Sequence, residues 1–335
     1  MSPVDRQRLF DPSVAFDHEA TAILLIGVAV VLVVPPVVLG LGRAFGFITP
    51  AIRRDIWKRY LPWPVLSVVI GGPIVLGAFW TILAAGLLGF LCFREYARAT
   101  GLFREKAVSY LTLLAMLLVY LAALDAWFGL FMALLPLGIA AIAGLTILQD
   151  RPKGYVQRVA LAVFAFALFG ACLGHAAYAA NHWHYRPLLL FFLIAVELND
   201  VLAFMSGRLF GRRKLCPNTS PNKTVAGAIG AMVGTTAFVV LVGPLAFANT
   251  GLDHAGRLAV LGLLVGLSGQ LGDLMLSSIK RDVGIKDMDA IIPGHGGLLD
   301  RFDSALLVAP VAFHFVNLFA GPGPDPPLCI FTGAR

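Results

Sequence analysis

The sequence predicts an all-α fold, a polytopic transmembrane helical bundle of about nine or ten spans. Of 335 residues, 59% are hydrophobic and only 13% are charged, whereas soluble domains carry about 25% charged residues. Apolar runs close to the ~20 residues needed to cross a bilayer recur along the chain. Basic residues cluster in the short loops between these runs. The net charge of +7 is therefore explained by membrane topology and phosphate contacts rather than by nucleic-acid binding.

The N-terminal residues argue against a cleavable signal peptide, and the cysteine spacing argues against a disulfide-bonded or zinc-binding protein. Residues 1–19 lack the basic start of a cleavable signal peptide, so the first apolar run is expected to remain as a span. The cysteines show no CxxC spacing, which argues against a disulfide framework and against a zinc site. They are Cys92, Cys172, Cys216 and Cys329.

The first half of the chain predicts a series of spans with one ambiguous segment. Pro35-Pro36 interrupts the first run, and such a kink is tolerated where neighbouring groups satisfy the freed carbonyls. Residues 63–93 are too long for one span and have basic loops on both sides. Two short crossings are favoured over a re-entrant segment or over a loop that breaks the positive-inside rule. The other spans expected here are 20–42, 108–124, 127–148 and 156–180.

The second half predicts a catalytic region at 187–320, following N-terminal transmembrane helices at 1–186. A basic loop at 206–223 separates two of its spans. Residues 321–335 are rich in proline and glycine and are expected to be a disordered tail. The spans expected in this half are 187–205, 224–248, 257–279 and 304–320.

His182 and His184 form an HxH pair on the loop before residue 187. A metal site usually needs three or four ligands, and no carboxylate or cysteine lies nearby in the sequence. Histidines and aromatic residues are also common at the membrane interface. We therefore expect an interfacial role for this pair.

The chemistry is expected in the segment 270–304, where acidic and basic residues lie between two apolar runs. A solvated cytoplasmic loop would explain its lysines and arginines but not its six aspartates. On a helix, four residues spaced i, i+4, i+7 and i+8 share one face, and they are Asp273, Ser277, Lys280 and Arg281. Asp300 and Asp303 share a face at the start of the last span. These acids could hold Mg²⁺, which takes one or two carboxylates together with waters and phosphates. An Asp–Lys pair that only locks two helices is the alternative for Asp273.

Two further features could handle phosphate groups. In the run 294–297, the glycines allow backbone N–H groups to approach an anion, and His295 either donates to a phosphate or orders the loop. Ser220 is expected to cap the helix at 224, which would place Lys223 and Thr224 in its first turn as a phosphate site. The sequence contains no P-loop. Glu197 and Asp200, with Arg208 beyond them, are either further ligands or a plain charge group.

Several of these motifs together resemble the CDP-diacylglycerol synthase (phosphatidate cytidylyltransferase) family. They are Ser277-x-x-Lys280-Arg281, the run Pro293-Gly-His-Gly-Gly-x-x-Asp-Arg-x-Asp303, Gly272-Asp273, Asn199-Asp200, Gly207-Arg-Leu-Phe-Gly211 and Ser220-Pro-Asn-Lys-Thr224. The resemblance covers roughly residues 190–320. It implies an integral-membrane enzyme that makes CDP-diacylglycerol and pyrophosphate from CTP and phosphatidate with Mg²⁺, for phospholipid biosynthesis.

The resemblance also implies roles for individual residues. Asp273 and Asp300 would be the metal carboxylates and, with Lys223 and Lys280, the catalytic residues. Substrate contacts would come from Ser220, Thr224, Arg281, Lys286, His295, Gly296, Arg301, Asp303 and Asp200. A second cation beside Mg²⁺ and a homodimer are both left open. The expected location is a bacterial inner membrane, with the active site facing the cytoplasm.

Four positions depart from the family pattern. Val225-Ala226 replaces Trp-Glu, Asn222 replaces a second lysine, and Phe204 replaces a tyrosine. These changes leave open a CTP-dependent transferase or kinase that acts on another lipid, such as a polyprenol or isoprenoid phosphate or alcohol. A non-catalytic membrane protein is the remaining alternative. It is disfavoured because transporters place their polar groups near the midplane of broken helices, whereas the charges here collect at span ends.

Overall fold

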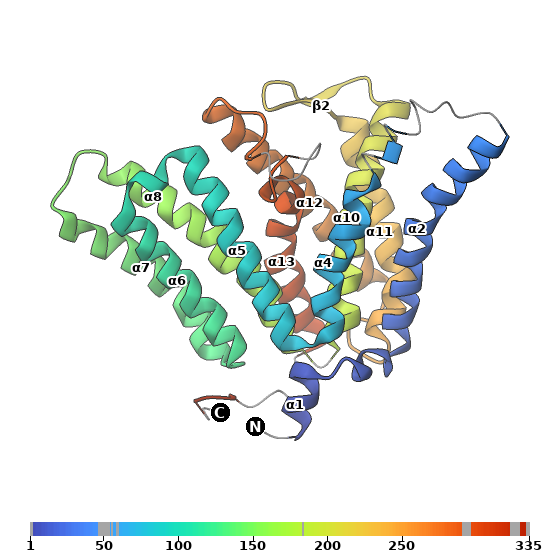
Figure 1. The fold of residues 1–335 in the computed structure, drawn as a ribbon, viewed down its shortest axis with the longest axis horizontal. Coiled ribbons are helices and arrows are strands. Elements are labelled where there is room, and N and C mark those ends of the chain that lie inside the picture. The colour runs from blue at the N-terminus through green and yellow to red at the C-terminus, as the bar shows by residue number, and fades with distance from the viewer. Residues whose placement is uncertain are drawn as a thin grey trace.

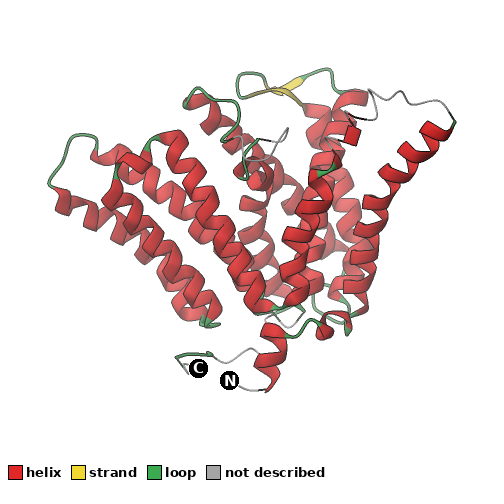
Figure 2. Cartoon of the chain, viewed as in Figure 1, coloured by secondary structure: helices red, strands yellow, loops and turns green. Residues whose placement is uncertain are grey.

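The fold is that of a computed structural model, which describes residues 3–45, 54, 56–57, 60–182, 184–289, 296–321 and 329–332. It is a bundle of helices with one small two-stranded hairpin (Figures 1 and 2). Among the described residues, nine helices are long and apolar enough to cross a membrane, and one shorter apolar helix accompanies them. The predicted all-α transmembrane class is therefore confirmed.

The chain enters the bundle through two short helical segments and one long helix. The long helix, α2, continues through Pro35 and Pro36 without a break. Its outward side chains are apolar and exposed, as expected for a lipid-facing span. The segments are α1 (Pro3–Phe10), the 3₁₀ helix η1 (Ser13–Phe16) and α2 (Glu19–Ala44).

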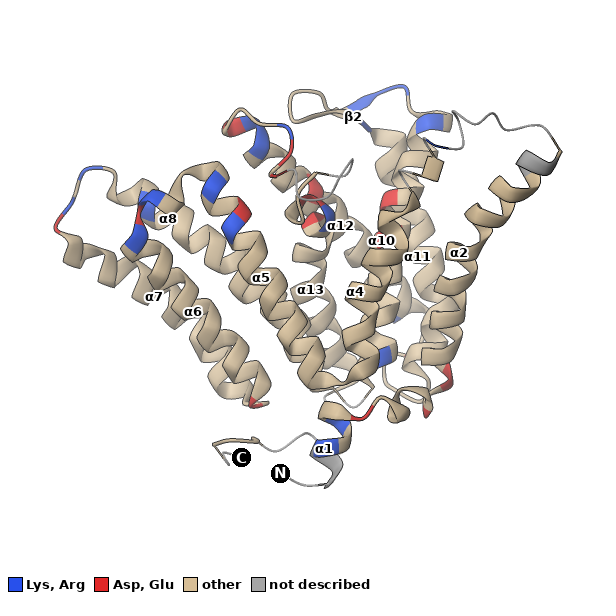
Figure 3. Cartoon of the chain, in the orientation of Figure 1, with Lys and Arg blue, Asp and Glu red and all other residues tan. Residues whose placement is uncertain are grey.

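Residues 63–93 form two helices, as favoured from the sequence. They are α4 (Pro62–Leu76) and α5 (Ala78–Thr100), and the chain turns between them at Gly77. Gly77 has a φ of +146°, and a Cβ there would overlap the backbone of Leu9, so this turn requires glycine. The beginning of α4 and the basic loop after α5 consequently lie at the same end of the bundle (Figure 3).

The next helices stack into the part of the bundle seen on the left of Figure 1. A π-helical stretch, η4, interrupts the span predicted at 156–180 without ending it. The hydroxyl of Tyr120 donates to the carbonyl of Phe169 in this stretch at 2.5 Å. The elements are the 3₁₀ helix η2 (Leu102–Arg104), α6 (Lys106–Leu124), α7 (Phe128–Thr146), the 3₁₀ helix η3 (Ile147–Gln149), α8 (Tyr155–Ala165), η4 (Phe166–Cys172) and α9 (Leu173–Ala179).

The C-terminal half supplies the remaining spans and the hairpin. One local prediction is wrong: Ser220 begins a β-strand and does not cap the following helix. Thr224 is the cap, and its Oγ1 accepts from the N–H of Gly227 at 3.1 Å. The elements are α10 (Tyr185–Phe210), β1 (Lys214–Cys216), β2 (Ser220–Thr224), α11 (Val225–Phe247), α12 (Ala255–Asp282) and α13 (Leu299–Phe319).

Helix α13 lies at the junction of the two halves. It packs on α12 and α10 on one side and on α9, η4 and α5 on the other. Most described lysines and arginines lie at the end of the bundle where α13 begins (Figure 3). Most of the predicted tail lies outside the described residues. Its described part donates to Asp125, including Thr332 Oγ1 to Asp125 Oδ2 at 2.6 Å.

Candidate active site

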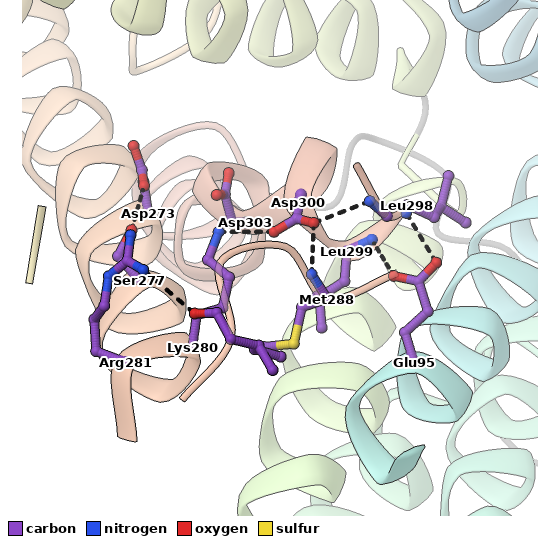
Figure 4. A network of polar contacts seen from close by, with 12 residues as sticks. Glu95, Asp273, Ser277, Lys280, Arg281, Met288, Leu298, Leu299, Asp300 and Asp303 are labelled. Atoms are coloured by element: carbon purple, nitrogen blue, oxygen red, sulfur yellow. Dashed lines mark hydrogen bonds and ion pairs between the residues drawn. The ribbon is translucent and has the colours of Figure 1, made fainter. Parts of the chain in front are cut away.

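The predicted site residues come together where α12 ends, α13 begins and β2 passes nearby (Figure 4). Asp273 and Lys280 lie on α12, Asp300 and Asp303 on α13, and Lys223 on β2. Residues far apart in the chain therefore form one charged cluster at the basic end of the bundle.

Asp273 and Lys223 form the first ion pair of the cluster. Lys223 Nζ lies 2.5 Å from Asp273 Oδ2, and both side chains are largely buried. Asp273 Oδ1 accepts from Ser277 Oγ at 3.2 Å, which confirms that these two residues share a helix face. Lys223 Nζ also lies 3.5 Å from Gln270 Oε1. Lys223 thus places a cation directly beside a buried carboxylate.

Asp300 and Lys280 form the second ion pair. Asp300 Oδ1 accepts from Lys280 Nζ at 2.7 Å. Asp300 Oδ2 accepts from the backbone N–H groups of Met288 and Gly297, each at 2.9 Å. The Gly297 N–H therefore donates to Asp300 and not to a phosphate. A contact between Gly296 and a phosphate of the substrate stays a prediction. Three groups from different parts of the chain, Lys280, Met288 and Gly297, thus hold Asp300.

Two further carboxylates add negative charge to the cluster. Asp200, on α10, accepts from Ser304 Oγ at 3.3 Å. Asp303 is 8% exposed, and its Oδ1 accepts from the backbone N–H of Ser304 at 2.8 Å. Both lie within electrostatic range of Asp273. Such a concentration of buried negative charge is costly unless a cation balances it.

The other predicted substrate residues are distributed around this cluster. Arg281 is exposed and donates from Nε to the carbonyl of Thr219 at 3.3 Å, which ties α12 to the hairpin. Lys286 and Arg301 are exposed, and Ser220 and Thr224 lie on β2. His295 lies outside the described residues.

The sequence analysis missed Glu95 on α5. Glu95 is 1% exposed, and its carboxylate accepts from the backbone N–H groups of Leu298 and Leu299, each at 2.9 Å (Figure 4). The available signal was an acidic residue just after the apolar run 63–93, among the basic residues that follow it. Asn199, named above only as part of a family motif, has a structural role. It is fully buried and donates to the carbonyl of Gly266 at 3.2 Å.

Comparison with known proteins decides the family. The model of the cytidylyltransferase family matches residues 57–319, well over half of the chain. The chain belongs to the cytidylyltransferase family. This confirms the family indicated by the motifs, and the match begins well before residue 190, where the recognisable motifs start.

Three relatives show how much of the chain is similar to known proteins. "Uncharacterized protein YnbB" of Escherichia coli (strain K12) is 34% identical over 257 residues, covering 75% of this chain and 82% of that protein. The phosphatidate cytidylyltransferase of Staphylococcus haemolyticus is 37% identical over 156 residues, or 44% of this chain and 59% of that protein. That of Brucella suis biovar 1 is 40% identical over 143 residues, or 43% and 51%. The chain thus matches a little over half the length of these named enzymes.

Asp273 and Asp300 are oxygen donors of the kind that Mg²⁺ takes from a protein. Among the described residues, no three Asp, Glu, His or Cys side chains could enclose a metal ion. Mg²⁺ usually needs only one or two carboxylates, with waters and substrate phosphates completing its shell. The buried amide nitrogen of Gln270, beside Lys223, has no hydrogen-bond partner in the described part of the chain. It is therefore available to a phosphate oxygen, and Asp273 and Asp300 stay the predicted metal ligands.

The HxH pair lies away from this cluster, and its contacts suit an interfacial role. His182 Nε2 lies 2.9 Å from the carbonyl of Gly321, and His182 Nδ1 accepts from the His184 N–H at 3.2 Å. Both ring nitrogens of His182 are thus in use. Burial lowers the pKa of His184 to about 4, so this side chain is neutral near pH 7.

Proposed function

We propose that this protein makes CDP-diacylglycerol and pyrophosphate from CTP and phosphatidate. The observation that carries the proposal is the convergence of the Lys223–Asp273 and Lys280–Asp300 pairs at one end of a family-typical membrane bundle. Relatives named phosphatidate cytidylyltransferase support the choice of lipid.

The reaction asks for positioning and charge neutralisation rather than covalent catalysis. A phosphate oxygen of the lipid attacks the α-phosphorus of CTP. A new P–O bond forms, the bond from the α-phosphorus to its bridging oxygen breaks, and pyrophosphate leaves. Lys223 and Lys280 would neutralise charge on the phosphates inside the site, and the exposed Arg281, Lys286 and Arg301 would do so at its rim.

A divalent cation would complement these residues. Asp273 and Asp300 would hold Mg²⁺, and Asp200 and Asp303 would add to its electrostatic attraction. Bound there, Mg²⁺ would polarise the phosphates and stabilise the negative charge of the leaving pyrophosphate. The lysines would keep the carboxylates neutralised when no nucleotide is bound.

The site is proposed to face the cytoplasm of a bacterial inner membrane. The end of the bundle that carries the site is also the end where the described basic residues gather (Figure 3). Positive charge on loops marks the cytoplasmic side of a membrane protein. CTP and a lipid headgroup could meet at that surface.

An apolar cavity of about 490 Å³ supports a lipid substrate. Helices α4, α5, α9, α10 and α13 line it, and Leu298, Phe302 and Ala305 line it beside Asp300 and Asp303. From Phe302, the lining continues along α13 to Val316, a rise of about 21 Å. An acyl chain lying there would leave its phosphate at the carboxylates.

The proposed reaction predicts Mg²⁺-dependent transfer of label from CTP into lipid. Purified protein given phosphatidate, Mg²⁺ and CTP labelled in the cytidine should form labelled CDP-diacylglycerol, and EDTA should abolish it. Thin-layer chromatography with mass spectrometry would identify the product. Label in a different lipid, when total bacterial lipid is supplied, would replace phosphatidate by that acceptor. No labelled lipid at all would contradict cytidylyl transfer to lipids.

The cavity predicts control of acyl-chain length. Ala309 lines it, so Ala309→Phe should lower kcat/KM for long-chain phosphatidate by about 10- to 100-fold while sparing dioctanoyl phosphatidate. Ala140→Phe is the matched control, because Ala140 is exposed on α7. Equal losses for both chain lengths in Ala309→Phe would place the acyl chain elsewhere.

A further inference from the structure

Glu95 is a buried carboxylate that connects the N-terminal half of the bundle to the catalytic segment. It lies near the end of α5 and is 1% exposed. Its Oε1 accepts from the N–H of Leu298 and its Oε2 from the N–H of Leu299, both at 2.9 Å. Both carboxylate oxygens are thus directed at the beginning of α13 (Figure 4).

These two N–H groups cannot be satisfied within α13 itself. The first N–H groups of a helix have no partner inside it, and a side chain at the N-cap usually binds one of them. The N-cap residue of α13 is Leu298, which supplies no side-chain hydrogen bond. Glu95 performs this capping from 203 residues away in the chain. Its negative charge also suits a helix N-terminus.

The same backbone holds Asp300. The Gly297 N–H donates to Asp300 Oδ2, and the next two N–H groups donate to Glu95. A Cβ on Gly297 would lie 2.5 Å from Glu95 Oε2, so glycine allows this approach. One turn beyond Glu95, the exposed Arg98 lies 3.9 Å from Asp289. Helix α5 thus contacts both Asp289 and the first turn of α13.

We propose that Glu95 is a positioning residue for cytidylyl transfer. By fixing the first turn of α13, it sets the positions of the Asp300 and Asp303 carboxylates. It need not touch substrate to do this. Its kinetic consequence rests on the proposed function. Displacing reacting or binding groups by about 1 Å can cost about 100-fold in rate.

The test is Glu95→Gln. Glutamine keeps the size but has one oxygen, so one N–H of α13 would face an NH₂ donor. We expect kcat per folded molecule to fall by about 10- to 100-fold. Hydrogen exchange of the peptide containing Leu298 and Leu299 should become faster. Glu105→Gln is the matched control, because Glu105 pairs with the exposed Arg151 at 3.3 Å and contacts neither α13 nor the charged cluster in any described interaction, and both readouts should stay unchanged.

A double-mutant cycle separates positioning from a general loss of stability. If Glu95 acts through Asp300, the kcat losses of Glu95→Gln and Asp300→Asn will not add in the double variant. Additive losses, or unchanged exchange with unchanged kcat, would overturn the proposal. If Glu95→Gln does not fold, Gly297→Ala disturbs the same contact and should show the same two effects. If the native protein transfers no cytidylyl group, the proposed function fails, while the exchange measurement still decides whether Glu95 orders α13.

Discussion

Replacing Asp300 with asparagine is expected to lower kcat for cytidylyl transfer by about 10²- to 10³-fold. Asp300 Oδ1 is paired with Lys280 at 2.7 Å, and its Oδ2 binds two backbone N–H groups at 2.9 Å. Asparagine removes the charge that faces Lys280 and the proposed metal. It also turns one oxygen acceptor into a donor. Single-turnover measurement with labelled CTP would give the rate of the chemical step.

Stability must be separated from catalysis at this position. The side chains of Asp300 and Lys280 are only 5% and 11% exposed, and breaking such a buried pair costs about 3–5 kcal/mol. Removing both charges, in Asp300→Asn with Lys280→Met, should restore much of the stability but none of the activity. Asp282→Asn, on an exposed residue of α12, is the matched control. A near-native kcat in Asp300→Asn would contradict a role for Asp300 in cytidylyl transfer.

The spans could be predicted because bilayer thickness dictates their length and composition. For the ambiguous residues 63–93, basic loops on both sides favour an even number of crossings, and the structure has two helices there. The hairpin Lys214–Thr224 was not predicted, because a capping interpretation of Ser220 explained the same residues. Strand pairing depends on contacts between the two strands, which the local sequence pattern of one strand does not contain.

The residues of the charged cluster could be predicted from the sequence, but the ion pairs that they form could not. Helical spacing correctly put Asp273 and Ser277 on one face. It also suggested that Lys280 is the cation beside Asp273. In the structure, Lys280 pairs with Asp300, and Lys223 pairs with Asp273. Those partners come from α13 and β2, so only the tertiary arrangement could reveal them. Glu95 was missed for the same reason, because its partners lie on a helix more than 200 residues away.

Replacing Lys223 with methionine is expected to lower kcat/KM for CTP by about 10²- to 10³-fold. Lys223 Nζ lies 2.5 Å from Asp273 Oδ2, and Asp200 and Asp303 are also within electrostatic range of Asp273. Without this lysine, the uncompensated carboxylates would repel the triphosphate of CTP. The loss should therefore appear mainly as a higher KM for CTP. Initial rates over a range of CTP concentrations would measure it.

Lys214 provides the matched control for Lys223. It lies on the paired strand of the same hairpin and is exposed, so Lys214→Met should leave kcat/KM near the native value. Lys223→Arg keeps the positive charge, but a planar guanidinium fits a close contact less well than a compact ammonium does. Its kcat/KM for CTP is therefore expected to lie between those of Lys223→Met and the native protein. An unchanged KM for CTP in Lys223→Met, with a lower melting temperature, would mean that Lys223 only neutralises Asp273. Phosphate binding would then depend on Lys280 and the exposed arginines. No other lysine pairs with Asp273 in the described part of the chain, so none could take the place of Lys223 there.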